Sequence, residues 1–79
     1  MTTLVGVNAG MNRNTFEAHH EGQIFRIEED FREVGAYLYV YEGHVCVRDY
    51  LQNDIEACMK LALDEYSVPL AAWAQKEEA

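Results

Sequence analysis

Histidine and cysteine are common zinc ligands, and this chain contains 3 histidines and 2 cysteines. His19, His44 and Cys46 could ligate zinc together if the strands that carry them lay side by side. Zinc sites normally have ligands spaced more closely along the chain, and the adjacent His19 and His20 would point to opposite faces of a strand. We therefore expect no metal site and no cofactor.

The histidines could instead act as the acid and base of a small enzyme, such as a nuclease. Such a site would combine His19, His44 and Tyr39 with Arg26 or Arg48. The sequence contains no glycine-rich phosphate loop, no Gly-x-Ser-x-Gly and no Cys-x-x-Cys motif. We expect a non-catalytic protein and keep an enzyme or ligand-binding domain built on His19, His44 and Tyr39 as the alternative.

Alternating tyrosines form the most unusual pattern, in the stretch YLYVYEGHVCV at residues 37–47. Side chains alternate between the faces of a strand, so these tyrosines share one face. Tyrosine and arginine are enriched at the centres of protein interfaces. Tyrosine is also common in β-strands for its β-propensity alone, in proteins that bind no partner through it. We predict that this face binds a protein through Tyr37, Tyr39, Tyr41, His44, Arg48 and Tyr50.

Two hairpins are predicted to position these residues, each turning at a Glu-Gly pair. A turn at Glu21-Gly22 places four apolar side chains on one face: Phe16, Ala18, Phe25 and Ile27. A turn at Glu42-Gly43 sets Tyr39 opposite Cys46. A type I turn with a glycine bulge competes there, because glutamate rarely adopts positive φ, but it would mix the faces. We expect the two-residue turn, which keeps one face apolar: Ala36, Leu38, Val40, Val45 and Val47.

An amphipathic helix is predicted in NDIEACMKLALDEYSV, residues 53–68. Asn53 is the expected N-cap, and Glu56 three residues later completes a capping box. The helix should end before Pro69, since the residue before a proline disfavours helical geometry. The apolar positions recur at helical spacing: Ile55, Met59, Ala62 and Tyr66, flanked by Cys58 and Leu63.

These elements predict a single domain over residues 1–79 with an α+β fold. We expect an antiparallel sheet of four or five strands, with one C-terminal amphipathic helix packed on one face. Leu4–Asn8 has strand composition and residues 9–15 indicate a loop. Residues 69–79 indicate a short helical tail with Pro69 in its first turn and Trp73 on its apolar side. Cys46 and Cys58 should face opposite sides of the sheet-helix interface, so we expect no disulfide between them.

The charge balance favours some partners over others. Asp and Glu number 14 against 6 Lys and Arg, for a net charge of −8. This charge repels nucleic acid and attracts a basic partner protein, although acidity also simply keeps proteins soluble. A chain of 79 residues buries a small core, so we expect a homodimer. Without a signal peptide or an apolar membrane span, we expect a cytoplasmic location.

The segment GAYLYVYEGHVCVRDYLQNDIEACMKLALDEY, Gly35–Tyr66, resembles the sheet-helix half of HicB-type antitoxins. In both, a hairpin runs into a helix that opens with Asp, an apolar residue, Glu and Ala. The family's usual turn with glycine and proline is absent here, as is an evident DNA-binding tail, so no residue role is carried over. The leading hypothesis is a small acidic inhibitor, immunity protein or antitoxin. A homodimer that uses the tyrosines only to associate with itself is another.

Overall fold

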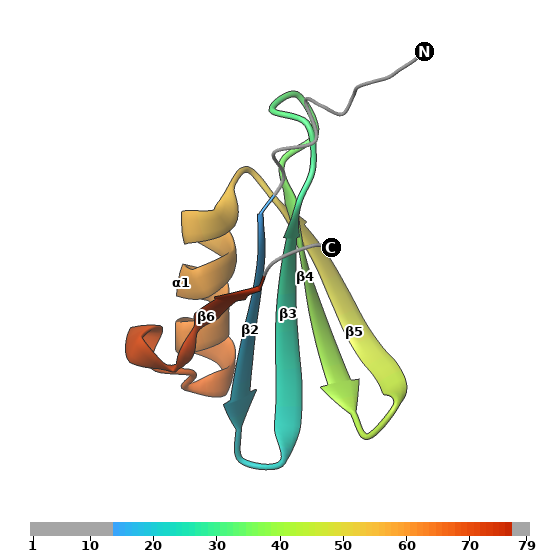
Figure 1. The fold of residues 1–79 in the computed structure, drawn as a ribbon, viewed down its shortest axis with the longest axis vertical. Helices are drawn as coiled ribbons and strands as arrows, with labels where there is room; N and C mark the ends of the chain where they lie inside the picture. The colour runs from blue at the N-terminus through green and yellow to red at the C-terminus, as the bar shows by residue number, and fades with distance from the viewer. Residues whose placement is uncertain (1–13, 77–79) are drawn as a thin grey trace.

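The computed structural model describes residues 14–76, in which five strands form one antiparallel sheet with a helix on one side (Figure 1). The strand order is β5-β4-β3-β2-β6, so β5 and β6 are the edges. The predicted α+β fold is therefore confirmed, whereas the strand predicted at Leu4–Asn8 lies outside the described residues. The elements are β2 (Thr15–His20), β3 (Gln23–Glu29), β4 (Ala36–Glu42), β5 (Val45–Gln52), α1 (Ile55–Tyr66), the 3₁₀ helix η1 (Leu70–Ala72) and β6 (Ala74–Lys76).

The first hairpin, β2 and β3, has the predicted register. Ala18 lies opposite Phe25, and residues Glu21 and Gly22 form the turn. Their φ angles are 50° and 81°, and two successive positive values are what a type I′ turn requires. The prediction was right because the turn residues and the apolar alternation select the same pairing.

The second hairpin, β4 and β5, turns one residue later than predicted. Glu42 pairs with Val45, which leaves Gly43 and His44 as the loop. Gly43 has a φ of 64°, and a positive φ at the first loop residue alone fits a type II′ turn. The predicted turn at Glu42-Gly43 is therefore wrong.

A β-bulge shifts the register further along this hairpin. Tyr41 pairs with Cys46 but Val40 pairs with Arg48, so Val47 is an additional residue on β5. Such a residue changes which face the following side chains occupy. The predicted pair of Tyr39 with Cys46 is consequently wrong, and Tyr39 lies opposite Asp49 instead.

The core lies between α1 and the sheet. Leu38 and Val40 are fully buried there, as predicted. Val45 and Val47 were predicted to join them but are 63% and 40% exposed, because the shifted turn and the bulge place them at the open end of an edge strand. The largest fully buried side chains are Phe25, Ile27, Leu38, Val40, Cys58 and Val68.

The N-cap of α1 is Asp54 rather than the predicted Asn53. The Asp54 carboxylate accepts a hydrogen bond of 2.8 Å from the backbone N–H of Ala57. The helix ends at Tyr66, and Ser67 adopts a left-handed φ of 63°. The predicted end before Pro69 is confirmed.

The buried face of α1 differs from the prediction at Leu61 and Leu63. Leu61 packs against the core, whereas Leu63, predicted to flank it, is 42% exposed. Cys58 is fully buried and Cys46 is exposed, and both are free thiols as expected. Burial raises the pKa of Cys58 to about 11.

The predicted helical tail is a single 3₁₀ turn, Leu70–Ala72, followed by a strand. Strand β6 pairs antiparallel with β2, with Lys76 opposite Thr15. Trp73 packs partly buried against the core. None of the helices in residues 14–76 is long and apolar enough to cross a membrane.

Candidate functional site

The sheet face opposite α1 carries the three alternating tyrosines of β4. Tyr37 and Tyr39 stack, with ring centroids 5.9 Å apart and an interplanar angle of 17°. On β3, the neighbour of Tyr41 is Ile24, that of Tyr39 is Arg26 and that of Tyr37 is Glu28. We call these six residues the tyrosine face: Ile24, Arg26, Glu28, Tyr37, Tyr39 and Tyr41.

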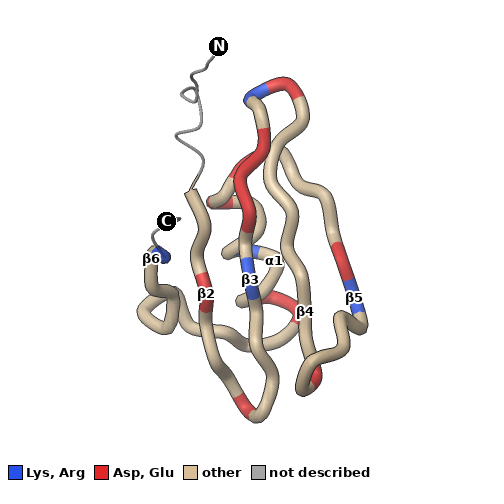
Figure 2. Tube along the Cα trace, turned by 45° about the vertical axis from the view of Figure 1, so that its right-hand side comes forward, with Lys and Arg blue, Asp and Glu red and all other residues tan. Residues whose placement is uncertain are grey.

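Ion pairs border the tyrosines on the side of β2. The Arg26 side chain lies 2.7 Å from the Glu28 carboxylate and 3.9 Å from that of Glu17. Lys76 of β6 approaches the same Glu17 carboxylate at 3.6 Å. The cations of this border are thus already paired with carboxylates, and Figure 2 shows acidic residues on both β2 and β3.

The acidic surroundings affect the central tyrosine. Burial, followed by the charge of Glu28 and then the neighbouring tyrosines and Asp49, raises the pKa of Tyr39. The phenol therefore keeps its proton at physiological pH. It can donate a hydrogen bond to a partner while its ring offers apolar area.

His44 lies beside the tyrosine face, although the predicted turn next to it was wrong. It belongs to the β4–β5 loop and lines a shallow hollow of about 340 Å³. The hollow is formed by Glu17, Ile24, Arg26, Glu28, Tyr41, Gly43 and His44. A side chain of a partner could enter it next to Tyr41.

Arg48 and Tyr50 do not belong to this face, contrary to the prediction. Tyr50 pairs with the buried Leu38, and its hydroxyl lies 2.7 Å from that of Tyr66 on α1. This hydrogen bond, together with burial, raises the pKa of Tyr66 to about 12. Arg48 pairs with Val40, so it also lies on the helix side.

Asp49 and Leu51 occupy the β5 positions beside the tyrosines instead. Asp49 lies opposite Tyr39, and Leu51 opposite Tyr37. The sequence did carry a signal for this arrangement. In the predicted register Asp49 would have faced Ala36 on the apolar side, and an unpaired carboxylate is costly to bury.

The enzyme alternative draws on residues of three segments: His19 on β2, Tyr39 on β4 and His44 in the β4–β5 loop. His19 is 68% exposed and lies 3.4 Å from Glu17. In the described part of the chain, no hydrogen bond joins His19 or His44 to Tyr39. Among residues 14–76, no group of three or more His, Cys, Asp and Glu side chains is placed to hold a metal ion.

Comparisons with protein-family models, with curated proteins and with solved structures find no match to this chain. The resemblance of residues 35–66 to HicB-type antitoxins thus rests on the outline of a hairpin followed by a helix. The fold defines an α+β protein with an open sheet, and the tyrosine face is its candidate functional site.

Proposed function

We propose that this chain is a small acidic protein-binding domain, of the inhibitor, immunity or antitoxin type, that docks a partner protein on its tyrosine face. The observation that carries this proposal is the cluster of three half-buried tyrosines, two of them stacked, on the side of the sheet away from α1. Within residues 14–76 no helix packs on that side. Aromatic side chains at such positions supply much of the free energy of protein association.

The partner surface should be basic. Glu17, Glu28 and Asp49 surround the tyrosines, and the whole chain carries a net charge of −8. Tyrosine rings attract the ammonium and guanidinium groups of Lys and Arg. A partner side chain of this kind could stack on Tyr39 and pair with a neighbouring carboxylate.

The test replaces Tyr39 with Ala and Tyr41 with Ser. Both side chains lie on the open face, so we expect folding to remain nearly intact while partner affinity falls about thirtyfold, the equivalent of about 2 kcal/mol. A partner captured from a cell extract would be purified and titrated calorimetrically with each variant. Thermal unfolding of the free variants would report folding.

Leu63→Ala is the matched control, because it also shortens a half-exposed side chain but lies on α1. It should leave partner affinity unchanged. If the tyrosine variants unfold readily, the tyrosines serve the core. If they bind as well as the unaltered protein, the tyrosines only favour the strand conformation, and the proposal is wrong.

A further inference from the structure

The outer edge of β5 has no partner strand among the described residues. This strand is 8 residues long, and its Leu51 side chain is 53% exposed. The open edge of such a strand presents backbone N–H and C=O groups that can pair with another strand. We propose that β5 pairs antiparallel with β5 of a second copy of this chain.

The edge of β5 carries no net charge, so two acidic molecules can approach each other there. Each copy has a net charge of −8, which opposes association. Within β5, however, Arg48 and Asp49 are the charged residues and cancel. Figure 2 shows this neighbouring pair of opposite charges on β5, whereas Glu28 and Glu29 outnumber Arg26 on β3.

The bulge and the two charges select one register. The bulge at Val47 interrupts the start of the strand and leaves Arg48–Gln52 regular. A two-fold axis at Tyr50 pairs this whole segment with itself, so that Asp49 faces Leu51 of the second copy. An axis at Arg48 or at Asp49 would place like charges directly opposite each other, which is destabilising.

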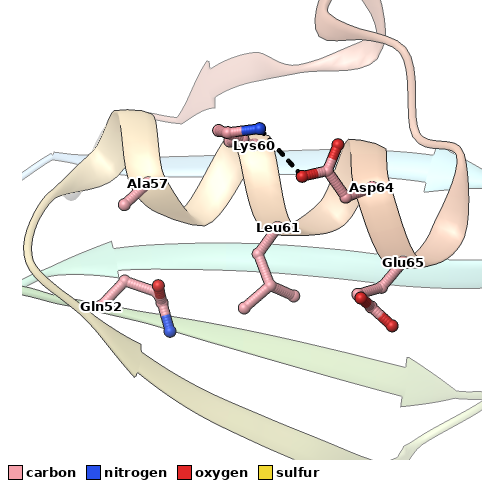
Figure 3. Close-up of a pocket in the computed structure, with 6 residues that line it drawn as sticks. All are labelled: Gln52, Ala57, Lys60, Leu61, Asp64 and Glu65. Carbon is pink, nitrogen blue, oxygen red and sulfur yellow. Dashed lines mark hydrogen bonds and ion pairs between the residues drawn. The ribbon is translucent and has the colours of Figure 1, made fainter.

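The two-fold axis that joins antiparallel edges stands perpendicular to the sheet. It keeps both helices on one side and both tyrosine faces on the other. On the helix side, a hollow of about 260 Å³ lies between α1 and β5, and Leu61 points into it (Figure 3). Its lining residues are Gln52, Ala57, Lys60, Leu61, Asp64 and Glu65.

The second copy would close the open side of this hollow. Arg48 of the second copy faces Gln52 at its rim in the proposed register. The antiparallel arrangement sets the Ala57 end of one hollow opposite the Glu65 end of the other, so the acidic ends do not meet. Pairing also covers the exposed Leu51, and a small domain gains stability from such burial.

The edge pairing leaves Tyr39 and Tyr41 uncovered, so it does not depend on the proposed function. If both hold, the dimer presents two tyrosine faces side by side. A Tyr39→Ala variant should then lose partner binding and remain dimeric, which separates failure of one proposal from failure of the other.

Two substitutions that introduce opposite charges at Leu51 test the proposed register. Leu51→Glu places a carboxylate opposite Asp49 of the second copy, twice, and should weaken dimerisation about tenfold or more. Leu51→Lys places an ammonium opposite the same carboxylate and should preserve the dimer. Val45→Glu is the matched control: it is also exposed and on β5 but lies beyond the bulge, so it should remain dimeric. Analytical ultracentrifugation over a range of concentrations would measure all three.

A distance measurement tests the same arrangement without altering the edge. Cys46 is exposed and Cys58 is buried, so a nitroxide label would attach to Cys46 alone. Each Cys46 is four residues from Tyr50, which places the two backbones about 25 Å apart in the dimer at about 3.3 Å per residue. Electron paramagnetic resonance should give one narrow distance near this value. A monomer at millimolar concentration, a dimer that tolerates Leu51→Glu, or a clearly different distance would each overturn the proposal.

Discussion

Gly35 allows the beginning of β4 to lie against the end of β5. Its φ is 115°, a backbone conformation that residues other than glycine rarely adopt. A methyl group at this position would also overlap the backbone carbonyl oxygen of Gln52. The close approach matters for the dimer as well, because Gln52 ends the β5 segment that is proposed to pair.

Replacing Gly35 with Ala should therefore destabilise the fold by about 3 kcal/mol or more, because strain and overlap act together. Gly22→Ala is the matched control: its φ of 81° is also positive, but nothing lies within 4 Å of the added carbon. That variant should lose only about 1 kcal/mol. Chemical denaturation would compare the two, and equal losses would mean that the overlap with Gln52 is relieved at little cost.

At the scale of single residues, the tyrosine face was partly predictable. Tyr37, Tyr39 and Tyr41 lie on one strand without interruption, so their period of two was sufficient to place them together. Arg48 and Tyr50 lie beyond the bulge, where that period no longer relates them to β4.

At the scale of elements, the start of α1 depends on two adjacent residues that both make good N-caps. Asn53 and Asp54 are each of a preferred type, and the structure uses Asp54, whose carboxylate meets the N–H of Ala57. Counting from Asn53 produces a capping box with Glu56, which is why the sequence pattern favoured the earlier residue.

The two caps can be separated by substitution. Asp54→Ala should cost about 1 kcal/mol of stability, because the Ala57 N–H loses its acceptor. Asn53→Ala should lower the stability by no more than a few tenths of a kcal/mol. Urea unfolding monitored by circular dichroism at 222 nm would measure both. A larger loss for Asn53→Ala would show that the helix begins one residue earlier in solution.

At the scale of the whole molecule, net charge acts in opposite directions on the two proposed surfaces. Two copies of a chain with a charge of −8 repel each other, whereas a basic partner is attracted. Salt shortens the range of both effects, from about 10 Å at 0.1 M to about 3 Å at 1 M ionic strength.

Raising the salt concentration over this range should thus strengthen dimerisation through β5 and weaken binding of the partner to the tyrosine face. Sedimentation would measure the first and calorimetric titration the second, on the same preparation. A dimer that weakens in salt would indicate that attraction between unlike charges holds it together. In that case the apolar and backbone pairing proposed for β5 would be wrong.

The sequence alone determined the α+β class, the first hairpin, the buried face of β4 and the helix. In each of these, two independent local signals agree: the turn residues at Glu21-Gly22 match the alternation around them, and the apolar spacing of α1 matches its end before Pro69.

Only the tertiary structure decided the second turn, the bulge and strand β6. The glycine of a Glu-Gly pair can be the second loop residue, in a type I′ turn, or the first loop residue, in a type II′ turn. The two turns differ by one residue in the position of the loop. The bulge at Val47 then turns Asp49 away from the core and brings Tyr50 to Tyr66. Strand β6 is short and exposed, and it is a strand because its backbone pairs with β2, which no pattern in its side chains reveals.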